Sequence, residues 1–293
     1  NCGPRYTITR SIPYDRAVTS MSCFPLCPRC SAEYADPADR RFHAQPVACP
    51  TCGPRLWFVD AAAASKGQTA PTAENQQQAL EQAVQTLLHG GILALKGLGG
   101  FQLACYARNA QSLQELRRRK TRPHKPLALM VGDLATARAL CDLTPEHEAL
   151  LQSPEKPVVL CPRRSAPQHA AITKNDAVYL PDEVAPDTSK IGIMLAYTPL
   201  HAVLFSRLAE CAPLPPVLVM TSANAGGEPI CLGNREALAR LAHLTDAWLL
   251  HDRDILVRVD DSVVTLQPSL SGTNAHGASA PAPQLAEPLF YRR

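Results

Sequence analysis

Two pairs of cysteines near the start of the chain constrain its folding more than any other feature. They follow the pattern Cys27-x2-Cys30-x18-Cys49-x2-Cys52. Each pair can present two thiolates to one ion, and two pairs complete a tetrahedral site. Four thiolates leave no open position, so the pattern predicts a structural Zn²⁺ ion. The segment 23–57 is rich in Pro and poor in apolar residues at helical spacing, and metal binding would supply the folding energy it lacks.

A short repeat surrounds this predicted zinc module. The sequence C-G-P-R occurs at residues 2–5 and again at residues 52–55. The repeat indicates two tandem modules, of which residues 1–22 would be the remnant of the first. Cys2 would then be the last ligand of that first module and cannot make a metal site alone. His43 lies between the two cysteine pairs and could replace a ligand, but we expect it to be a bystander.

Composition excludes several classes of protein. The chain of 293 residues has 11 Cys, which are dense only up to Cys52, unlike those of a short secreted disulfide scaffold. We therefore expect a reduced, cytoplasmic compartment, and no signal peptide opens the sequence. The apolar runs fall far short of the ~18 residues that a membrane span needs. The net charge is only +3, so double-stranded RNA or another nucleic acid is not expected as a partner.

The rest of the chain has the pattern of an α/β domain. Residues 58–76 have a linker composition, and an amphipathic helix then ends at Gly90-Gly91. Short apolar strands are expected at 92–96, 127–131, 157–161, 191–195, 217–221, 247–251 and 261–266. Helices are expected between them at 109–119, 134–142, 145–152, 199–210 and 234–243. This alternation predicts a largely parallel or mixed sheet over residues 77–266, followed by a mobile linker or tail at 267–293.

Two loops carry groups that bind anions. Lys120, Arg122 and Lys125 lie between a helix and a strand, in a stretch stiffened by two prolines. Such a run is as often a solvated basic surface. The stretch Thr221-Ser222-Ala223-Asn224 directly follows an apolar strand and offers hydroxyls, an amide and backbone N–H groups. The same residues are also ordinary turn formers.

Two further loops are weaker candidates. The stretch Lys96-Gly97-Leu98-Gly99-Gly100-Phe101 follows a strand and could wrap an anion, but it matches neither a P-loop nor a dinucleotide fingerprint. In the segment 258–262, a cation lies beside paired carboxylates, which suits a nucleotide or Mg²⁺ contact or a simple hairpin salt bridge. No nucleophile elbow or catalytic triad stands out. The residues alone therefore predict a phosphate-binding α/β domain with a zinc module.

Taken together, these motifs resemble those of the HypF family of hydrogenase-maturation carbamoyltransferases. The resemblance covers residues 1 to about 266. It rests on motifs that occur in the family's order: residues 36–46, Cys49-Pro50-x-Cys52-Gly53-Pro54-Arg55, Lys96-Gly97-x-Gly99-Gly100-Phe101, Arg119-Lys120-x-Arg122-x-x-Lys125-Pro126, Tyr197-Thr198-Pro199-Leu200-His201, Thr221-Ser222-Ala223-Asn224 and Arg258-x-Asp260-Asp261-Ser262. The sequence departs from the family at Val257, where Arg is common, and in the longer Ala/Pro-rich stretch 267–288.

The resemblance implies a YrdC-like twisted mixed-sheet domain with a concave ligand cavity, preceded by a four-cysteine zinc ribbon. It also implies that this part of the protein joins carbamate, derived from carbamoyl phosphate, to ATP. The resulting carbamoyl adenylate would serve to carbamoylate the C-terminal cysteine of a HypE-like partner. Lys96, Lys120 and Arg122 would neutralise phosphate and carbamate. The nucleotide and its Mg²⁺ would be held by Lys125, Thr221, Ser222, Asn224, Arg258 and Asp261.

Two alternatives to this function stay open at the level of sequence. The chain could be a non-catalytic module that binds nucleotide or docks HypE. It could also be a YrdC-type threonylcarbamoyl-adenylate synthase that uses threonine, bicarbonate and ATP. The zinc module and the C-G-P-R repeat argue against the second alternative.

Overall fold

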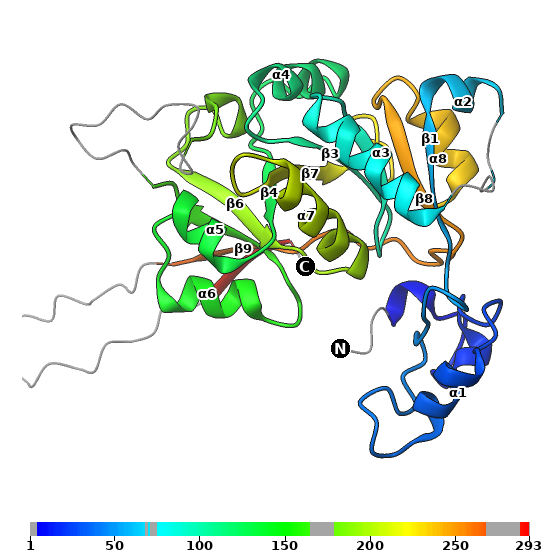
Figure 1. Cartoon of the computed structure of the whole chain (residues 1–293). Helices are drawn as coiled ribbons and strands as arrows, with labels where there is room; N and C mark the ends of the chain where they lie inside the picture. Colours follow the sequence, from blue (N-terminus) through cyan, green and yellow to red (C-terminus); the bar gives the residue numbers. More distant parts are fainter. Residues whose placement is uncertain (1–4, 68–69, 71–74, 165–178, 268–287, 293) are drawn as a thin grey trace, which may run out of the picture.

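One mixed sheet of ten strands organises the chain beyond the cysteine pairs (Figure 1). The computed structural model describes residues 5–67, 70, 75–164, 179–267 and 288–292. Cys2 and most of the expected tail lie outside these residues. The strands are, in sheet order, β1 (Leu56–Asp60), β8 (Ala247–His251), β2 (Leu93–Lys96), β3 (Phe101–Tyr106), β7 (Val217–Ser222), β4 (Ala128–Val131), β6 (Lys190–Leu195), β5 (Val158–Pro162), β9 (Val263–Leu266) and β10 (Pro288–Arg292).

Helices cover both faces of this sheet. One face packs against α3 (Gln76–Leu88) and α7 (Pro199–Cys211). The other face packs against α2 (Ala61–Ser65), α4 (Ala110–Arg119), α5 (Leu134–Leu140), α6 (Pro145–Gln152) and α8 (Asn234–Arg240). Each face therefore has its own apolar core. Among the described residues, no helix is both long and apolar enough to cross a membrane.

Helix α3 shows how the sequence sets these boundaries. The Asn75 side chain accepts a hydrogen bond from the backbone N–H of Gln77 and so caps the first turn. Leu80, Val84 and Leu87 recur on one face and are buried, which stabilises the domain by about 1.5–3 kcal/mol for each side chain. Gly90 ends the helix with a φ of 86°, a conformation that favours glycine.

Most of the expected α/β pattern is confirmed, and three strands are additions. Each predicted strand is present, and no strand end differs from its expected position by more than two residues. Strands β1, β3 and β10 were not expected. Residues 58–65, expected to be linker, instead complete β1 and form α2, because Trp57 and Val59 alternate into the core as strand β1 pairs with β8. At the other end of the chain, residues 288–292 do not extend from the domain as a tail but pair with β9.

A small lobe precedes the sheet and contains the cysteine pairs. It comprises two short 3₁₀ helices, Tyr6–Ile8 and Arg16–Val18, and helix α1 (Pro28–Ala35). The Arg16 guanidinium joins the early segment to the cysteine module by donating hydrogen bonds to backbone carbonyls. Its acceptors lie 2.6–2.8 Å away and belong to Phe24, Gln45 and Val47. Arg16 thus packs the early segment onto the cysteine module.

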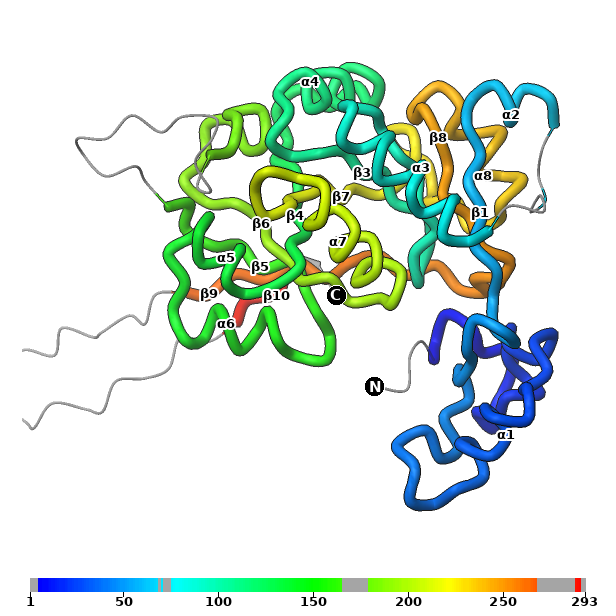
Figure 2. Tube along the Cα trace, viewed as in Figure 1, coloured from blue at the N-terminus to red at the C-terminus, as the bar shows by residue number. Residues whose placement is uncertain are grey.

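The lobe lies beside the end of the sheet that carries β1 and β8 (Figure 1; Figure 2). Two hydrogen bonds attach it to the loop that follows β8. The backbone N–H of Arg55 donates to Asp252 Oδ1 at 2.7 Å, and that of Leu256 donates to the carbonyl of Thr7 at 2.7 Å. The position of the loop after β8 therefore depends in part on the lobe.

Candidate functional site

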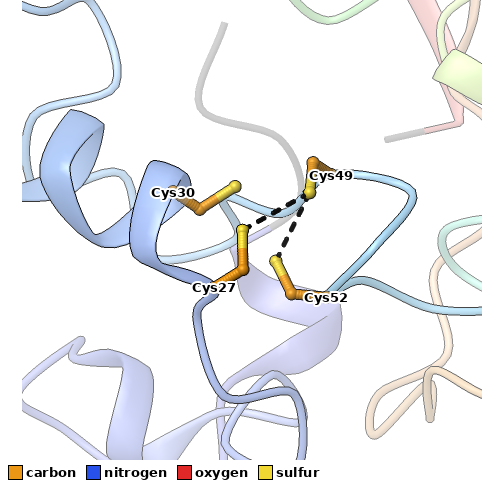
Figure 3. Close-up of side chains that lie close together, drawn as sticks. All are labelled: Cys27, Cys30, Cys49 and Cys52. Atoms are coloured by element: carbon orange, nitrogen blue, oxygen red, sulfur yellow. Dashed lines mark hydrogen bonds between the residues drawn. The ribbon is translucent and has the colours of Figure 1, made fainter.

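The four predicted zinc ligands meet in one cluster (Figure 3). The Sγ atoms of Cys27, Cys30, Cys49 and Cys52 all lie within 4.8 Å of one another. Cys49 Sγ is 3.7 Å from both Cys27 Sγ and Cys52 Sγ. A tetrahedral ion with Zn–S bonds of about 2.3 Å requires S–S separations of about 3.8 Å. The donor set and its spacing therefore fit Zn²⁺ in a structural site.

Local backbone structure brings these thiols together. Cys27 caps α1, and Pro28 starts the helix, so Cys30 falls in its first turn and is buried. In the second pair, backbone groups of Cys52 and Thr51 bond to the Cys49 thiolate and lower its pKa to about 6. Such stabilisation of the thiolate favours a metal ligand at Cys49, whereas burial raises the pKa of Cys30 in the same cluster.

His43 lies outside this cluster. In the part of the chain that the structure describes, the potential metal ligands gathered here are the four cysteines alone. The ring of His43 stacks on Tyr34 with centroids 5.1 Å apart and meets Phe42 edge-on at 4.3 Å. These ring contacts give His43 a packing role.

The basic loop, residues 120–126, is in direct contact with the loop Thr221–Asn224 that follows β7. Lys120 Nζ donates to the carbonyl of Ser222 at 2.5 Å, to that of Asn224 at 3.1 Å and to Asn224 Oδ1 at 3.2 Å. Ser222 Oγ donates to the same Oδ1 at 2.8 Å. Lys120 is only 8% exposed, and burial lowers its pKa to about 8, with Arg122 adding to the effect. The loop after β7 is thus held around a buried cation.

Arg122 extends this contact to the end of β7. Its Nη1 donates to Thr221 Oγ1 at 3.1 Å and its Nη2 to the carbonyl of Pro126 at 3.1 Å. The side chain of Lys125, by contrast, is exposed. The structure therefore brings Lys120, Arg122, Thr221, Ser222 and Asn224 together, and it leaves Lys125 at the surface of the same loop.

Arg117 holds the basic loop in shape and was not anticipated. Its guanidinium donates to the carbonyls of Arg122, Pro123 and Lys125 at 2.8–3.1 Å and to that of Glu183 at 2.8 Å. The sequence shows three consecutive arginines here, so none stands out. The available signal is helical spacing, since residue 117 lies one turn after the buried Leu113, on the inward face of α4.

Lys96 lies in a different environment from Lys120. It ends β2, is 2% exposed, and donates from Nζ to the carbonyl of His251 at 3.0 Å. Burial lowers its pKa to about 8, while Asp254 opposes that shift and Arg253 adds to it. The predicted cations therefore divide into two groups, one at β7 and one between β2 and the loop after β8.

Asp261 lies just before β9 and belongs to a third cluster, with Gln102 of β3 and Tyr197. Its carboxylate accepts from Gln102 Nε2 at 3.0 Å and from Tyr197 Oη at 3.2 Å. Gln102 is the register partner of Ser222 across β3 and β7, which places this cluster next to the β7 loop. Burial, with the Asp261 charge, raises the pKa of Tyr197 well above its usual value. Gln102 and Tyr197 are site neighbours that sequence reasoning did not single out.

The segment 258–261 packs against the glycine loop, residues 96–101. Arg258 Nε donates to the carbonyl of Ile230 at 2.7 Å, and the backbone N–H of Val259 donates to the carbonyl of Gly99 at 3.1 Å. Four loops that are far apart in sequence therefore meet at one end of β2, β3 and β7. They are residues 96–101, 120–126, 221–231 and 258–261.

Comparisons with known families match both parts of the chain. The Sua5–YciO–YrdC family model, described as "Telomere recombination", matches residues 85–272. The "HypF finger" model matches residues 26–59. Solved structures of the first family share the fold at low identity. The crystal structure of E. coli YciO, for example, is 16% identical over 75% of this chain and 90% of that one, with a TM-score of 0.54.

Several curated relatives that match this chain over both parts carry the name carbamoyltransferase HypF. The chain is 46% identical to "Carbamoyltransferase HypF" of Rhodobacter capsulatus, covering 94% of this chain and 33% of the relative. It is 37% identical to "Probable carbamoyltransferase HypF" of Methanocaldococcus jannaschii, covering 90% and 31%. A crystal structure of T. kodakarensis HypF is 39% identical over 91% of this chain and 32% of that one, with a TM-score of 0.78.

Another similar structure is that of full-length HypF "in the phosphate- and nucleotide-bound form", with 41% identity and a TM-score of 0.76 over 91% of this chain and 31% of that one. The chain thus spans about a third of the length of the relatives it matches. Its fold, its four-cysteine cluster and both family matches agree. The chain belongs to the Sua5–YciO–YrdC family and carries that domain behind a HypF finger, as the HypF carbamoyltransferases do.

Proposed function

We propose that this chain carries out the adenylate-forming step of a HypF-type carbamoyltransferase, in which carbamate and ATP give carbamoyl adenylate and pyrophosphate. The observation that carries the proposal is the docking of Lys120 and Arg122 onto the loop Thr221–Asn224. This arrangement gathers two cations, two hydroxyls and an amide at a strand end, which suits a polyphosphate. Similarity to HypF proteins supports it.

The reaction itself requires electrostatic help rather than a covalent catalyst. A carbamate oxygen forms a bond to the α-phosphorus of ATP, and the bond between that phosphorus and the bridging oxygen breaks. Pyrophosphate leaves with the electron pair of the broken bond, and no proton has to move. Because the nucleophile is already an anion, the barrier arises from bringing two anions together and from charge on the leaving group.

The residues of the β7 loop meet this requirement in the proposal. Arg122 and Lys120 neutralise phosphate oxygens, and Thr221, Ser222 and Asn224 orient the nucleotide through hydroxyl and amide groups. Lys125 lies on the exposed side of the same loop, where it can reach the outer phosphates. Lys96 acts on the carbamate side. A concave cavity that excludes water is also expected, because carbamate and its adenylate decompose in water.

Mg²⁺ would neutralise phosphate charge and polarise the leaving group when bound with ATP. Asp261 is the carboxylate proposed to assist it. Both of its oxygens also accept hydrogen bonds from Gln102 and Tyr197, so this carboxylate would be fixed in place before the metal arrives. Arg258, anchored on Ile230, would close the site beside the glycine loop.

In the complete pathway proposed here, the carbamate comes from carbamoyl phosphate, and the carbamoyl group goes on to the C-terminal cysteine of a HypE-like partner. The zinc module would keep the lobe folded. A cytoplasmic location follows from the same proposal, since ATP and reduced thiols are both required.

The test is ATP–pyrophosphate exchange by the purified chain. Exchange that depends on carbamate is expected, and no stimulation by threonine plus bicarbonate. Exchange that depends on threonine would support a threonylcarbamoyl-adenylate synthase instead. ATP binding without exchange under either condition would support the non-catalytic module.

A further inference from the structure

The four-cysteine cluster concentrates negative charge inside a small lobe (Figure 3). Four thiolates bring two more charges than one Zn²⁺ ion neutralises. Cys30 is buried, and Cys27, Cys49 and Cys52 are half-buried, so water reaches this charge only in part. Charge that is removed from water is costly unless an opposite charge or hydrogen bonds offset it. A cation close to the cluster would therefore stabilise the zinc-loaded site.

Arg16 is placed to supply that charge. Its guanidinium lies within the lobe and donates hydrogen bonds to the carbonyl oxygens of Phe24, Gln45 and Val47 at 2.6–2.8 Å. Phe24 lies three residues before the first cysteine pair, and Val47 lies two residues before the second. One planar group thus holds the backbone that leads into both pairs.

The electrostatic surroundings of Arg16 agree with this placement. Burial lowers the pKa of Arg16, and the charges of Cys52, Tyr34 and Cys30 oppose that shift. The sulfur atoms are therefore within electrostatic reach of the guanidinium, which stays protonated at neutral pH. The adjacent carboxylate of Asp15 is exposed and accepts from the backbone N–H of Arg16. In the described part of the chain, no ion pair joins the Arg16 guanidinium to a carboxylate.

A second arginine near the cluster, Arg41, is already paired. The hydrogen bond and the charge of Glu33 raise the pKa of Arg41, and the charge of Cys30 adds to that effect. Arg41 Nη1 lies 2.5 Å from Glu33 Oε2, and Arg29 Nε lies 3.1 Å from Glu33 Oε1. Arg41 therefore shares its charge with a carboxylate, whereas the charge of Arg16 faces the thiolates.

We infer that Arg16 is a supporting residue of the zinc site. Its charge offsets the surplus negative charge of the thiolates, and its hydrogen bonds fix the approach to both cysteine pairs. Groups that support metal ligands without touching the metal typically change its affinity by about 10–100-fold. The match to the HypF finger covers residues 26–59 and so leaves Arg16 out. The assignment extends the metal module to the preceding segment, and it does not depend on the proposed reaction.

The test measures zinc affinity of the purified chain by competition with a chelator of known affinity. Arg16→Gln removes the charge and should weaken zinc binding by about 10–100-fold. Arg16→Lys keeps the charge but loses the planar fork, so its zinc affinity should lie between those of Arg16→Gln and the wild type. Arg10→Gln, at an exposed arginine of the same segment, is the matched control and should bind zinc as the wild type does.

Cobalt shows whether the ligands themselves have changed. At saturating Co²⁺, Arg16→Gln should give the same thiolate-to-cobalt absorption as the wild type, because all four cysteines still bind. A different spectrum at saturation would mean that Arg16 only shapes the fold of the lobe, and it would contradict the assignment.

The remaining outcomes are equally decisive. Wild-type zinc affinity in Arg16→Gln would overturn the assignment. Arg16→Lys as weak as Arg16→Gln would remove the role of the charge, and Arg16→Lys as tight as the wild type would remove the role of the hydrogen bonds. Either result would contradict the assignment as stated. If Arg16→Gln does not fold even in excess zinc, Arg16→Lys decides, and wild-type zinc affinity in that variant would refute the assignment.

Discussion

Arg122 is the residue whose removal tests phosphate binding most cleanly. Its guanidinium bonds to Thr221 Oγ1 and to the carbonyl of Pro126 but lies in a loop, outside both apolar cores. Arg122→Ala should weaken ATP binding by about 2 kcal/mol, or about 30-fold, as for the loss of one charged donor. Titration calorimetry measures the change, and circular dichroism should be unaltered. The control is Arg164→Ala, at an exposed arginine, which should bind ATP as the wild type does. Wild-type ATP affinity in Arg122→Ala would contradict the prediction and would mean that the basic loop is only a solvated surface.

The low pKa of Lys120 gives the same site a dependence on pH. Burial lowers this pKa from 10.5 to about 8, so the side chain carries its charge below pH 8 and loses it above. ATP affinity in the free chain should therefore fall as pH rises from 7 to 9, up to tenfold for each unit above the pKa. A Lys120→Arg variant, which stays charged, should flatten that fall. Affinity that is constant up to pH 10 in the wild type would contradict the assignment.

At the same scale, the sequence pointed to Lys120 and Arg122, which contact the loop after β7, but not to Arg117, which positions them. Lys120 and Arg122 could be placed because they lie between a helix and a strand. Arg117 bonds to three carbonyls of that loop, yet it looks like its neighbours in the sequence. Its burial depends on the long-range contact of α4 with residues near Glu183, which local spacing does not reveal.

Among the elements, the glycine loop offers a test with a matched control. A Cβ at Gly99 would lie 2.8 Å from the carbonyl carbon of Val259, so Gly99→Ala must push the glycine loop away from the segment 258–261. The expected result is a lower melting temperature together with weaker ATP binding. Gly226→Ala meets nothing within 4 Å, and its thermal unfolding and ATP binding should match the wild type. Equal behaviour of the two variants would show that the close approach does not matter.

The elements that the sequence missed have identifiable reasons. Strand β3 begins at Phe101, directly after a run of glycines, and so resembled the end of a loop. Strand β1 follows the last cysteine pair after only three residues, which hides it within the metal module. Helix α1 lacks apolar spacing because its inward group is Cys30, a metal ligand, rather than a run of aliphatic side chains. In each case a long-range partner, not local pattern, determines the element.

For the molecule as a whole, zinc should stabilise more than the lobe. Structural zinc contributes about 10–16 kcal/mol to the folding of small zinc-finger peptides. Cys49→Ser should lose the zinc and unfold the lobe. Because Arg55 and Thr7 contact the loop after β8, and Lys96 donates to the carbonyl of His251 at the start of that loop, ATP–pyrophosphate exchange should also weaken. Metal analysis and the exchange assay measure this, with Cys211→Ser, at an exposed cysteine of α7, as the control. A Cys49→Ser chain that keeps zinc and fold would refute the four-thiolate site.

The architecture was predictable to the level of a mixed α/β sheet behind a metal module. The alternation of short apolar strands with helices was enough for that, since each element must bury one face. The sequence did not predict the order of the strands or the packing of residues 5–22 through Arg16. Both arise from contacts between distant segments. The same holds for the pairing of β10 with β9 after a long intervening stretch.

The most direct test of the central claim is the choice of acyl substrate in ATP–pyrophosphate exchange. Threonine-carbamate would bring a second carboxylate and a hydroxyl, and each polar group left unpaired would cost roughly 1–3 kcal/mol. The loop 96–101 offers one cation, bare backbone and the buried ring of Phe101, which suits a small acyl group. We predict that carbamate, supplied directly or from carbamoyl phosphate by an added acylphosphatase, supports exchange and that threonine with bicarbonate does not. Robust exchange that depends on threonine would contradict it.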